Sequence, residues 1–335
     1  MNLVTGASGL LGSHIVEQLR RRGRPVRVLV RPQTDRSWLE TQGVEFAEGD
    51  VTDAASLGRA CAGVEVVYHA AAKVGDWGPW EEFERVTIGG TRNVIEAAVA
   101  ARVRRLVHIS SISVYGYYDQ PQIIDESWPT AYRLYRWAYY SRSKVVAEQL
   151  VREAHRAGRI EAAVIRPAWI YGPRDRTTTP RLYRMITAGR AKILGRGDNH
   201  LNAVYAGNVA EAAILAAEIP AAAGEVFNVS NDGQITQQAY FDLWAQACQA
   251  PPVRRRVPYR AAYLAGLLFE CAGRLLRRKQ PPFVTRYAVW LMGRRSYFST
   301  AKAQRVLGWK PTVPYEVGVP ETVRWYREQV LGQYA

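Results

Sequence analysis

Three side chains of this 335-residue chain have the types and the spacing that proton transfer requires. Tyr140 and Lys144 lie four residues apart, so in a helix they share one face. A phenol with an ordinary pKa near ~10 is a poor base at neutral pH, but a neighbouring ammonium, together with the positive nicotinamide of an oxidised cofactor, would favour the phenolate and lower that pKa. Ser111 follows a strand-like segment and could hydrogen-bond an oxygen on which charge develops. Such pairs also arise by chance on amphipathic helices, so the elements around them decide the interpretation.

The first dozen residues predict a site for a dinucleotide. A short apolar strand at 2–4 is followed by a helix at 13–22, and three glycines spaced three apart lie between them. Gly6 permits the turn off the strand, Gly9 lets backbone amides approach a pyrophosphate, and Gly12 lets helix and strand pack closely. The positive end of the helix dipole would then face the phosphates. We expect contacts from the loop residues Thr5, Gly6, Ser8, Gly9, Leu10, Leu11 and Gly12.

Further contacts with the dinucleotide are expected after the later strands. An NAD-preferring domain usually ends its second strand with an acid, whereas this chain has Arg31 there and Arg36 nearby. Arginines suit the 2′-phosphate, so we expect NADP(H), with NAD(H) as the alternative. The plain alternative for both arginines is a solvated surface. The other expected contacts are Asp50 and Val51 at the adenine edge, the small residues Ala70, Ala71 and Ala72, and Lys73, Pro167, Tyr140 and Lys144.

Strand and helix patterns alternate through the first half of the chain. Apolar strand patterns occur at 26–30, 44–47, 65–69, 103–109 and 162–165, with helical periodicity at 90–101 and 139–157. This alternation predicts an α/β fold, a doubly wound parallel (Rossmann) sheet with ligands at the carboxyl ends of its strands. Strands at 201–205 and 225–229 flank a further helix at 209–218. We predict a dinucleotide-binding domain of residues 1–166 plus 201–230, and a smaller, mostly helical substrate-binding lobe of 167–200 plus 231–335.

With these motifs in this order, the chain resembles the extended short-chain dehydrogenase/reductase superfamily over nearly its whole length. The matching features are the Thr5–Gly12 loop, Gly49-Asp50, Gly90-Thr91 with Asn93, Ser111 before Val114-Tyr115-Gly116, Tyr140 with Lys144, and Arg166-Pro167 leading to Tyr171-Gly172-Pro173. The resemblance makes Ser111, Tyr140 and Lys144 the catalytic residues. Thr87 replaces the asparagine that the family usually has before its Gly-Thr helix motif, and we expect this change to loosen that helix.

Within the superfamily the chain is most similar to the 3β-hydroxysteroid dehydrogenase-like branch and to bacterial 2-alkyl-3-oxoalkanoate reductases. The similar stretches are 71–78, 281–287, and the tail 297–300 with 307–311. This resemblance implies an NADP-dependent oxidoreductase that interconverts a 3-oxo and a 3-hydroxy group on a sterol-like or long-chain substrate. Tyr140 would move the proton, and Lys144 would hold the nicotinamide ribose. Trp77, Ser111 and Trp169 are the expected substrate contacts.

Two alternative functions stay open on the sequence alone. A nucleotide-sugar 4-epimerase with tightly bound NAD uses the same three side chains, and Arg174, Arg176 and Arg181 could clamp its anionic substrate. A sugar dehydratase fits less well, because Ile112-Ser113 supply no carboxylate beside the catalytic serine. A non-catalytic NADP sensor would share the glycine loop, but such proteins typically lose the tyrosine or the lysine.

The net charge of +15 is concentrated in one part of the chain. Residues 253–295 contain eleven Lys or Arg and one acid, Glu270, so this stretch carries 11 − 1 = +10. It includes a predicted helix, Ala261–Leu276, with Tyr263, Leu264, Leu267, Leu268, Cys271 and Leu275 on one side. Basic clusters at 254–256 and 277–279 flank that helix. The pattern fits peripheral membrane contact through 254–295, an apolar lid over the substrate cleft, or an ordinary packed helix.

The bulk composition sets the remaining expectations. Hydrophobic residues at 48% and charged residues at 22% are typical of a folded protein with a substantial core. The three cysteines, Cys61, Cys248 and Cys271, lack metal-ligand spacing, so we expect reduced thiols, no metal and a cytoplasmic location, with membrane association as an open alternative. We expect no leader peptide and no membrane span, which would need an apolar run of about 18 residues. No nucleic-acid-binding motif accompanies the charge. By family resemblance we expect a homodimer through the helix bearing Tyr140.

Overall fold

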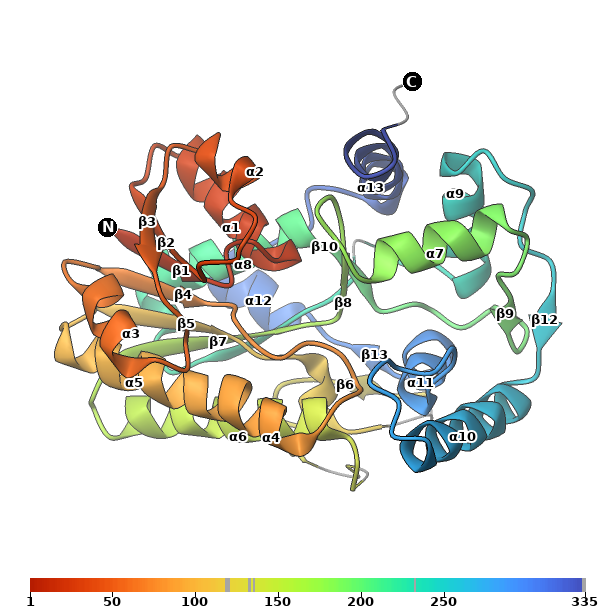
Figure 1. The fold of residues 1–335 in the computed structure, drawn as a ribbon, viewed down its shortest axis with the longest axis horizontal. Helices are drawn as coiled ribbons and strands as arrows, with labels where there is room; N and C mark the ends of the chain where they lie inside the picture. Colours follow the sequence, from red (N-terminus) through yellow and green to blue (C-terminus); the bar gives the residue numbers. More distant parts are fainter. Residues whose placement is uncertain (118–120, 132–133, 135, 232, 333–335) are drawn as a thin grey trace.

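A seven-stranded parallel sheet forms the centre of the computed structural model, which describes residues 1–335 except 118–120, 132–133, 135, 232 and 333–335 (Figure 1). Its strands are β1 (Asn2–Thr5), β2 (Val26–Val30), β3 (Glu45–Glu48), β4 (Val66–His69), β5 (Arg105–Ile109), β7 (Glu161–Pro167) and β11 (Val226–Val229). They lie in the order β11-β7-β5-β4-β1-β2-β3, and every pairing is parallel. The predicted doubly wound sheet is therefore confirmed. Its strand order reverses between β1 and β4, where such sheets bind ligands.

Helices cover both faces of the sheet, which explains why its strands are continuous apolar runs. One face is covered by α1 (Leu10–Arg21) and α8 (Ala206–Glu218), the other by α3 (Ala54–Cys61), α5 (Gly90–Ala100) and α6 (Tyr139–Arg156). Short α2 (Ser37–Glu40) follows β2, and α4 (Trp80–Phe83) leads into a π-helical segment, Glu84–Gly89, before α5. The central strands β4 and β5 are buried along their whole length.

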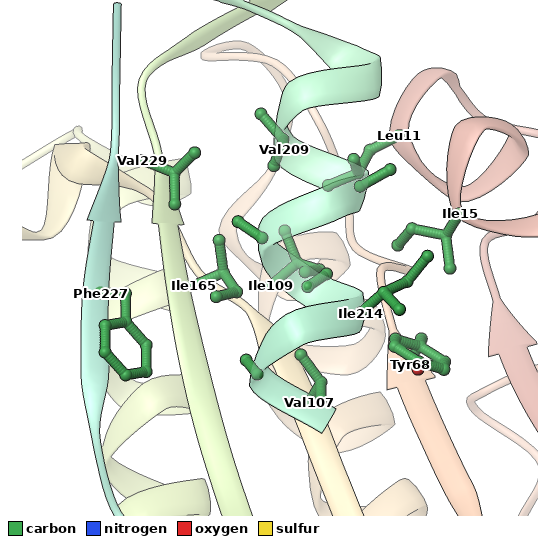
Figure 2. Close-up of a cluster of buried hydrophobic side chains, with 14 of the residues drawn as sticks. Leu11, Ile15, Tyr68, Val107, Ile109, Ile165, Val209, Ile214, Phe227 and Val229 are labelled. Atoms are coloured by element: carbon green, nitrogen blue, oxygen red, sulfur yellow. The ribbon is translucent and has the colours of Figure 1, made fainter. Parts of the chain in front are cut away.

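The core beneath the glycine loop is built on α8, a helix rich in buried alanine. Figure 2 shows α8 lying against the sheet between Leu11 and Ile15 of α1 and the strand residues Ile165 and Phe227. Alanines let α8 approach the sheet closely, because they present only a methyl group at the contact. The glycine loop therefore begins a helix whose inner face is fixed by tight packing on two sides.

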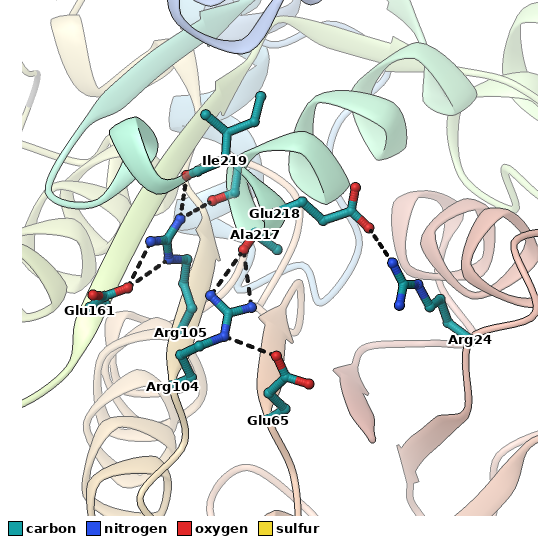
Figure 3. Close-up of polar contacts among 9 residues, drawn as sticks. Arg24, Glu65, Arg104, Arg105, Glu161, Ala217, Glu218 and Ile219 are labelled. Carbon is teal, nitrogen blue, oxygen red and sulfur yellow. Dashed lines mark hydrogen bonds and ion pairs between the residues drawn. The ribbon is translucent and has the colours of Figure 1, made fainter.

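At its carboxyl terminus α8 is fastened by arginines from β5 and the residue before it. Arg105 Nη1 donates to the carbonyls of Ala216 (3.1 Å) and Ile219 (2.6 Å), and Arg104 donates to Ala217 (3.3 Å from Nη2) (Figure 3). Arg105 is buried and also pairs with Glu161, with 2.7 Å between Nη2 and Oε2. The arginines thus satisfy the last carbonyls of the helix and complement the negative end of its dipole.

The second lobe is mostly helical and is assembled from separated pieces of chain. It contains α7 (Thr178–Thr187), α9 (Gln237–Ala247), α10 (Tyr259–Leu275), α11 (Arg286–Gly293) and α13 (Tyr315–Gln329), with the strand pairs β8 (Trp169–Tyr171) with β10 (Ala203–Tyr205), β9 (Ile193–Leu194) with β12 (Arg256–Val257), and β6 (Ile123–Ile124) with β13 (Tyr297–Phe298). The strand expected at 201–205 is thus β10, which pairs with β8 outside the central sheet. Helix α12 (Ala301–Leu307) returns to the sheet beside β11 and α8.

Within the described part of the chain, no helix has the length and apolar character needed to cross a bilayer. Helix α10 lies at the edge of the molecule, and α13 lies on the opposite side of the view in Figure 1.

Candidate active site

The three predicted catalytic side chains meet at the carboxyl end of β5. Ser111 follows β5 and caps a short 3₁₀ turn, Ile112–Tyr115, its Oγ accepting from the backbone N–H of Ser113 (3.1 Å). Tyr140 is half-buried in the first turn of α6 and lies near enough to Ser111 for the serine side chain to lower the pKa of its phenol. Lys144, one turn further along α6 and buried, donates from Nζ to the carbonyl of Ile109 (2.6 Å). Parallel-strand geometry and one helix face thus bring these side chains together across 29 to 33 residues of sequence.

The electrostatics of Tyr140 differ from the sequence-based expectation. Burial raises the pKa of the Tyr140 phenol, and the hydrogen bond with Ser111 lowers it only in part. Lys144 is not among the groups that shift this pKa; its ammonium is directed at the Ile109 carbonyl. Burial lowers the pKa of Lys144 itself to about 8, opposed by the charge of Glu148. In the chain alone the phenol therefore keeps its proton at neutral pH. The expected lowering of its pKa also depends on the positive nicotinamide of an oxidised cofactor, so it stays a prediction.

A buried ionic network lies one turn beyond Lys144, and sequence analysis missed it. Glu148 accepts from Arg166 Nε (3.0 Å) and from the hydroxyl of Ser110 (2.7 Å), and both charged side chains are almost fully buried. Arg166 also donates to the hydroxyl of Tyr115 (2.7 Å), which donates to Asn228 Oδ1 (2.7 Å). The network ties α6 to β5, β7 and β11. Two features of the sequence could have indicated this network: Glu148 lies four residues after Lys144, on the same face of the helix, and Arg166 belongs to the Arg-Pro motif of the family.

The glycine loop has the shape that a pyrophosphate requires. Gly6 has φ +70°, and a Cβ there would lie 2.8 Å from the backbone nitrogen of Ala71. A Cβ on Gly12 would lie 2.1 Å from the carbonyl oxygen of Gly6. Helix α1 begins directly after Gly9, which offers no side chain to cap its first amides. Those amides face the end of the loop, so the residues present fit a dinucleotide phosphate group.

Residues around the glycine loop are held by a buried histidine that sequence analysis did not identify. His69 at the end of β4 lies 2.8 Å from Thr5 Oγ1 through Nδ1 and 3.0 Å from Thr91 Oγ1 through Nε2. Burial lowers the pKa of His69 to about 3, so the ring is neutral and bridges β1 to α5. The adjoining Ala70 and Ala71 flank Gly6 through their backbones.

Thr87, at the position where the family usually has asparagine, connects the loop after β4 to the segment before α5. Its Oγ1 accepts from the backbone N–H of Lys73 (3.1 Å), and its carbonyl accepts from Thr91 Oγ1 (2.6 Å). The side chain is buried, in the π-helical segment that precedes α5. Thr87 thus anchors the loop after β4, and the expected loosening relative to asparagine stays a prediction. Lys73 itself forms an ion pair with Glu82, with 2.5 Å between Nζ and Oε2.

The residues expected at the adenosine end occupy varied environments. Arg31 is exposed and, among the described residues, forms no ion pair, whereas Arg36 pairs with Glu48 (2.8 Å). Asp50 accepts from the backbone and hydroxyl of Thr52, so its side chain holds the turn before α3. Val51 is buried against Gly90 at the start of α5. Ser8, Leu10 and Ala72 are half-buried at the loop, while Leu11 and Pro167 are buried in the sheet region.

The surface beside Tyr140 is formed by the second lobe. Tyr287 of α11 contacts the Tyr140 ring edge-on, with 6.4 Å between centroids, and stacks obliquely on Trp290 (5.8 Å). A small cavity here is also lined by Asp76, Tyr117 and Tyr263. Tyr263 lines a second cavity of about 590 Å³ as well, together with Leu264 and Leu267 of α10. Tyr287 and Tyr140 are 147 residues apart in the sequence, so no local sequence pattern could predict their contact.

Neither tryptophan expected to line the substrate cleft takes that position. Trp77 lies against α10, where its Nε1 donates to the carbonyl of Arg278 (2.9 Å) and Arg274 lies over its ring (5.3 Å). Trp169 packs edge-on against Tyr240 (5.7 Å) in the core of the second lobe. Asp76, the neighbour of Trp77, reaches the cavity instead, and burial raises the pKa of its carboxyl.

The three arginines considered as an anion clamp are engaged elsewhere. Arg174 contacts Ser13 (2.9 Å), forms an ion pair with Glu17 and lies over the ring of Trp38 (4.4 Å). Arg176 pairs with Asp35 (2.9 Å). Arg181 donates to the carbonyl of Phe283. The first two therefore join the segment after β8 to α1 and to the loop after β2, rather than gathering around one anion.

Known proteins match this arrangement in sequence and in fold. The family model described as "NAD dependent epimerase/dehydratase family" matches residues 2–230. A 2-alkyl-3-oxoalkanoate reductase from Shewanella oneidensis is 32% identical over 94% of this chain and 84% of its own length. A decarboxylating sterol-4-alpha-carboxylate 3-dehydrogenase from Mus musculus is also 32% identical, over 96% of this chain and 89% of its own. The crystal structure of a UDP-glucuronic acid 4-epimerase from Bacillus cereus in complex with NAD has a TM-score of 0.77 at 22% identity, covering 100% of this chain and 99% of the other, a likeness of fold.

Proposed function

Because the chain belongs to the NAD dependent epimerase/dehydratase family of extended short-chain dehydrogenases/reductases, and is thus an NAD(P)-dependent enzyme, we propose that it interconverts a 3-oxo and a 3-hydroxy group on an apolar substrate. The observation that carries the proposal is the placement of Tyr140 and Ser111 at the carboxyl end of β5, where Ser111 acts on the Tyr140 phenol and the buried Lys144 contacts the last carbonyl of the strand. The reductase and dehydrogenase relatives support this chemistry.

Tyr140 acts as the proton donor during carbonyl reduction. Its raised pKa keeps the phenol protonated at neutral pH, which suits transfer of a proton to an oxygen that is becoming an alkoxide. Ser111 donates a second hydrogen bond to that oxygen and stabilises the developing charge. In the reverse direction Tyr140 must first lose its proton, so alcohol oxidation is favoured at higher pH. Lys144, with a pKa of about 8, supplies a positive charge near this proton transfer at neutral pH.

NADP(H) is the proposed cofactor, and when bound it supplies or accepts the hydride at the substrate carbon. The Gly6–Gly12 loop and the first amides of α1 would hold its pyrophosphate. Arg31, exposed and without an ion pair among the described residues, would bind the 2′-phosphate. Lys144 would hold the nicotinamide ribose by leaving the carbonyl of Ile109.

An apolar substrate is favoured by the surfaces around Tyr140. Tyr287, Trp290 and Tyr117 provide aromatic walls, and the cavity of about 590 Å³ beyond Tyr263 is within the usual size range of small-molecule sites. Arg174, Arg176 and Arg181, which were considered as a clamp for a nucleotide diphosphate, have other partners. These contacts favour a lipid-like carbonyl compound over a sugar nucleotide.

The proposal is tested by following reduced-nicotinamide absorbance with a long-chain 3-oxoalkanoate, a 3-oxosterol and UDP-glucose. We expect oxidation of NADPH with one of the first two, and a loss of about 10²- to 10⁴-fold in kcat for Tyr140→Phe with unchanged cofactor affinity. The matched control is Tyr139→Phe, because the ring of Tyr139 packs on Trp80 (5.7 Å) and phenylalanine keeps that contact. An epimerase returns the hydride to its substrate and changes no net absorbance, so formation of UDP-galactose from UDP-glucose is followed separately by chromatography. That product alone would establish the epimerase, and tight NADP binding without any turnover in either assay would establish a sensor.

The choice of cofactor is tested by Arg31→Asp. Replacing the exposed guanidinium by a carboxylate repels the 2′-phosphate, so the ratio of NADP to NAD affinity should fall by about tenfold or more, which is roughly 1.4 kcal/mol. The control is Arg59→Asp, which makes the same change of charge at an exposed position on α3. Equal ratios in the two variants would show that Arg31 does not bind the phosphate.

A further inference from the structure

Helix α10 presents its leucines outward and its small residues inward. Leu264, Leu268 and Leu275 are 55%, 60% and 84% exposed and lie within a narrow arc of the helix at spacings of four and seven. The residues buried on α10 are Ala262, Gly266, Glu270 and Gly273, which project on the opposite side. The predicted apolar side of this helix is therefore not its packing side.

The inward face of α10 is fully used in holding the helix to the protein. A Cβ on Gly266 would lie 2.9 Å from the backbone nitrogen of Arg286, so α10 and α11 approach closely. Glu270 accepts from the backbone N–H (2.7 Å) and the guanidinium (2.7 Å) of Arg286. Gly273 abuts the ring of Trp77. Because α10 is fixed in this orientation, its leucines cannot turn inward without breaking a buried ion pair.

The exposed charge of the stretch that carries the leucines, residues 253–295, has one sign. Other segments bring two acids to this surface: Asp242 pairs with Arg254 (3.0 Å), and Asp198 lines the cavity beside Leu264. Between 253 and 295 the only acid is Glu270, which is buried and paired. The exposed cations of this stretch are Arg254, Arg255, Arg256, Arg260, Arg274, Arg277, Arg278, Lys279 and Arg295. They lie mainly before the first leucine and after the last, at the two ends of α10. A second copy of this chain would bring two such cationic surfaces together, which favours a partner of negative charge.

We propose that α10 docks this protein on an anionic lipid surface. The helix would lie in the plane of the membrane, with Leu264, Leu268 and Leu275 entering the headgroup–acyl boundary and the cations at its ends contacting acidic headgroups. An apolar helix face with cations at both ends is complementary to a membrane surface, where acidic headgroups cover apolar acyl chains. Docking does not depend on the enzymatic activity. If the proposed function also holds, the cavity lined by Leu264 and Tyr263 opens beside the lipid that carries the substrate.

The first experiment uses Cys271 as a reporter, because it lies on the leucine side of α10 and is exposed, whereas Cys61 and Cys248 are buried. An environment-sensitive fluorophore on this thiol should shift to the blue with vesicles of phosphatidylcholine containing about one third phosphatidylglycerol. Flotation of unlabelled protein should show binding about tenfold or more tighter than to phosphatidylcholine alone. Salt at about 1 M should remove that difference, since the Debye length falls to about 3 Å. No shift and no flotation would overturn the proposal.

The second experiment changes the leucines without changing charge. Leu268→Ser/Leu275→Ser should weaken binding to the anionic vesicles by about tenfold or more. The matched control is Val317→Ser/Val330→Ser, which removes exposed apolar side chains on the α13 side of the molecule and should bind like the parent protein. Equal loss in both variants would overturn the proposal. So would a lipid-free dimer in analytical ultracentrifugation that only the α10 variant dissociates, because α10 would then join two copies of this chain.

Discussion

Helices α6 and α10 have nearly the same length, 18 and 17 residues, but they use their two sides in opposite ways. Helix α6 buries Lys144 and Glu148 among apolar side chains and gives each a partner, Ile109 and Arg166. Helix α10 buries small residues around Glu270 and leaves three leucines exposed. The comparison shows that polar residues on a helix can mark its buried side when the protein supplies their hydrogen bonds. Apolar residues on a helix, such as the leucines of α10, can likewise mark the side that faces away from the protein core.

The largest effect should follow from breaking the buried ion pair that joins Glu148 of α6 to Arg166 of β7. Glu148→Ala leaves the Arg166 guanidinium buried without its carboxylate, which should lower the free energy of unfolding by about 3–5 kcal/mol. Chemical denaturation followed by circular dichroism measures the change. Glu153→Ala is the control, because Glu153 is exposed on the same helix. Equal destabilisation of the two variants would show that the network contributes nothing beyond helix formation.

A second prediction concerns the charge that α6 carries into the site. With a pKa of about 8, Lys144 is protonated at neutral pH and loses its charge as the pH rises through that value. Carbonyl reduction should therefore decline above about pH 8, and Lys144→Met should be slow, by about 10²-fold, at every pH. Lys144→Arg should remove the decline, because a guanidinium stays protonated. A pH profile of kcat for the three proteins tests this, and an unchanged profile in Lys144→Arg would assign the decline to another group.

The smallest effect is expected on the outer side of α10. Because both leucines are exposed, Leu268→Ser/Leu275→Ser should change the free energy of unfolding by less than about 1 kcal/mol, mostly through helix propensity. On α6, Val151→Ser at a fully buried position should cost several times more, about 2–3 kcal/mol. Thermal unfolding of the two variants sharpens the comparison. A large loss from the α10 variant would mean that its leucines are covered in the folded protein.

The sequence predicted the frame of the molecule well for a physical reason. Buried parallel strands are continuous apolar runs, so Val26–Val30 is found at its predicted bounds and the other strands of the sheet lie within a few residues of theirs. The glycine loop and the pair Tyr140 and Lys144 consist of residues that are close together in the sequence, so they can be identified without a structure. The roles assigned to these side chains stay predictions.

Long-range contacts and orientations were not available from local patterns. The periodicity of α10 identified its apolar side, but only the contacts of Gly266 and Glu270 with Arg286 decide which way that side faces. Trp77 was expected to contact the substrate, and the structure places it against α10, where its indole N–H donates to the carbonyl of Arg278. Tyr287 reaches Tyr140 only through the packing of the second lobe.

The arginines at the start of β5 have a consequence at the other end of that strand. Arg105 fastens the strand to α8, while the Ile109 carbonyl and Ser111 at the far end meet α6. Because Arg105 holds the start of β5, the strand keeps its register when the sequence of the substrate-binding lobe changes. Substitutions in α10, α11 and the loop before them can thus change the substrate specificity while the positions of Ser111, Tyr140 and Lys144 stay the same.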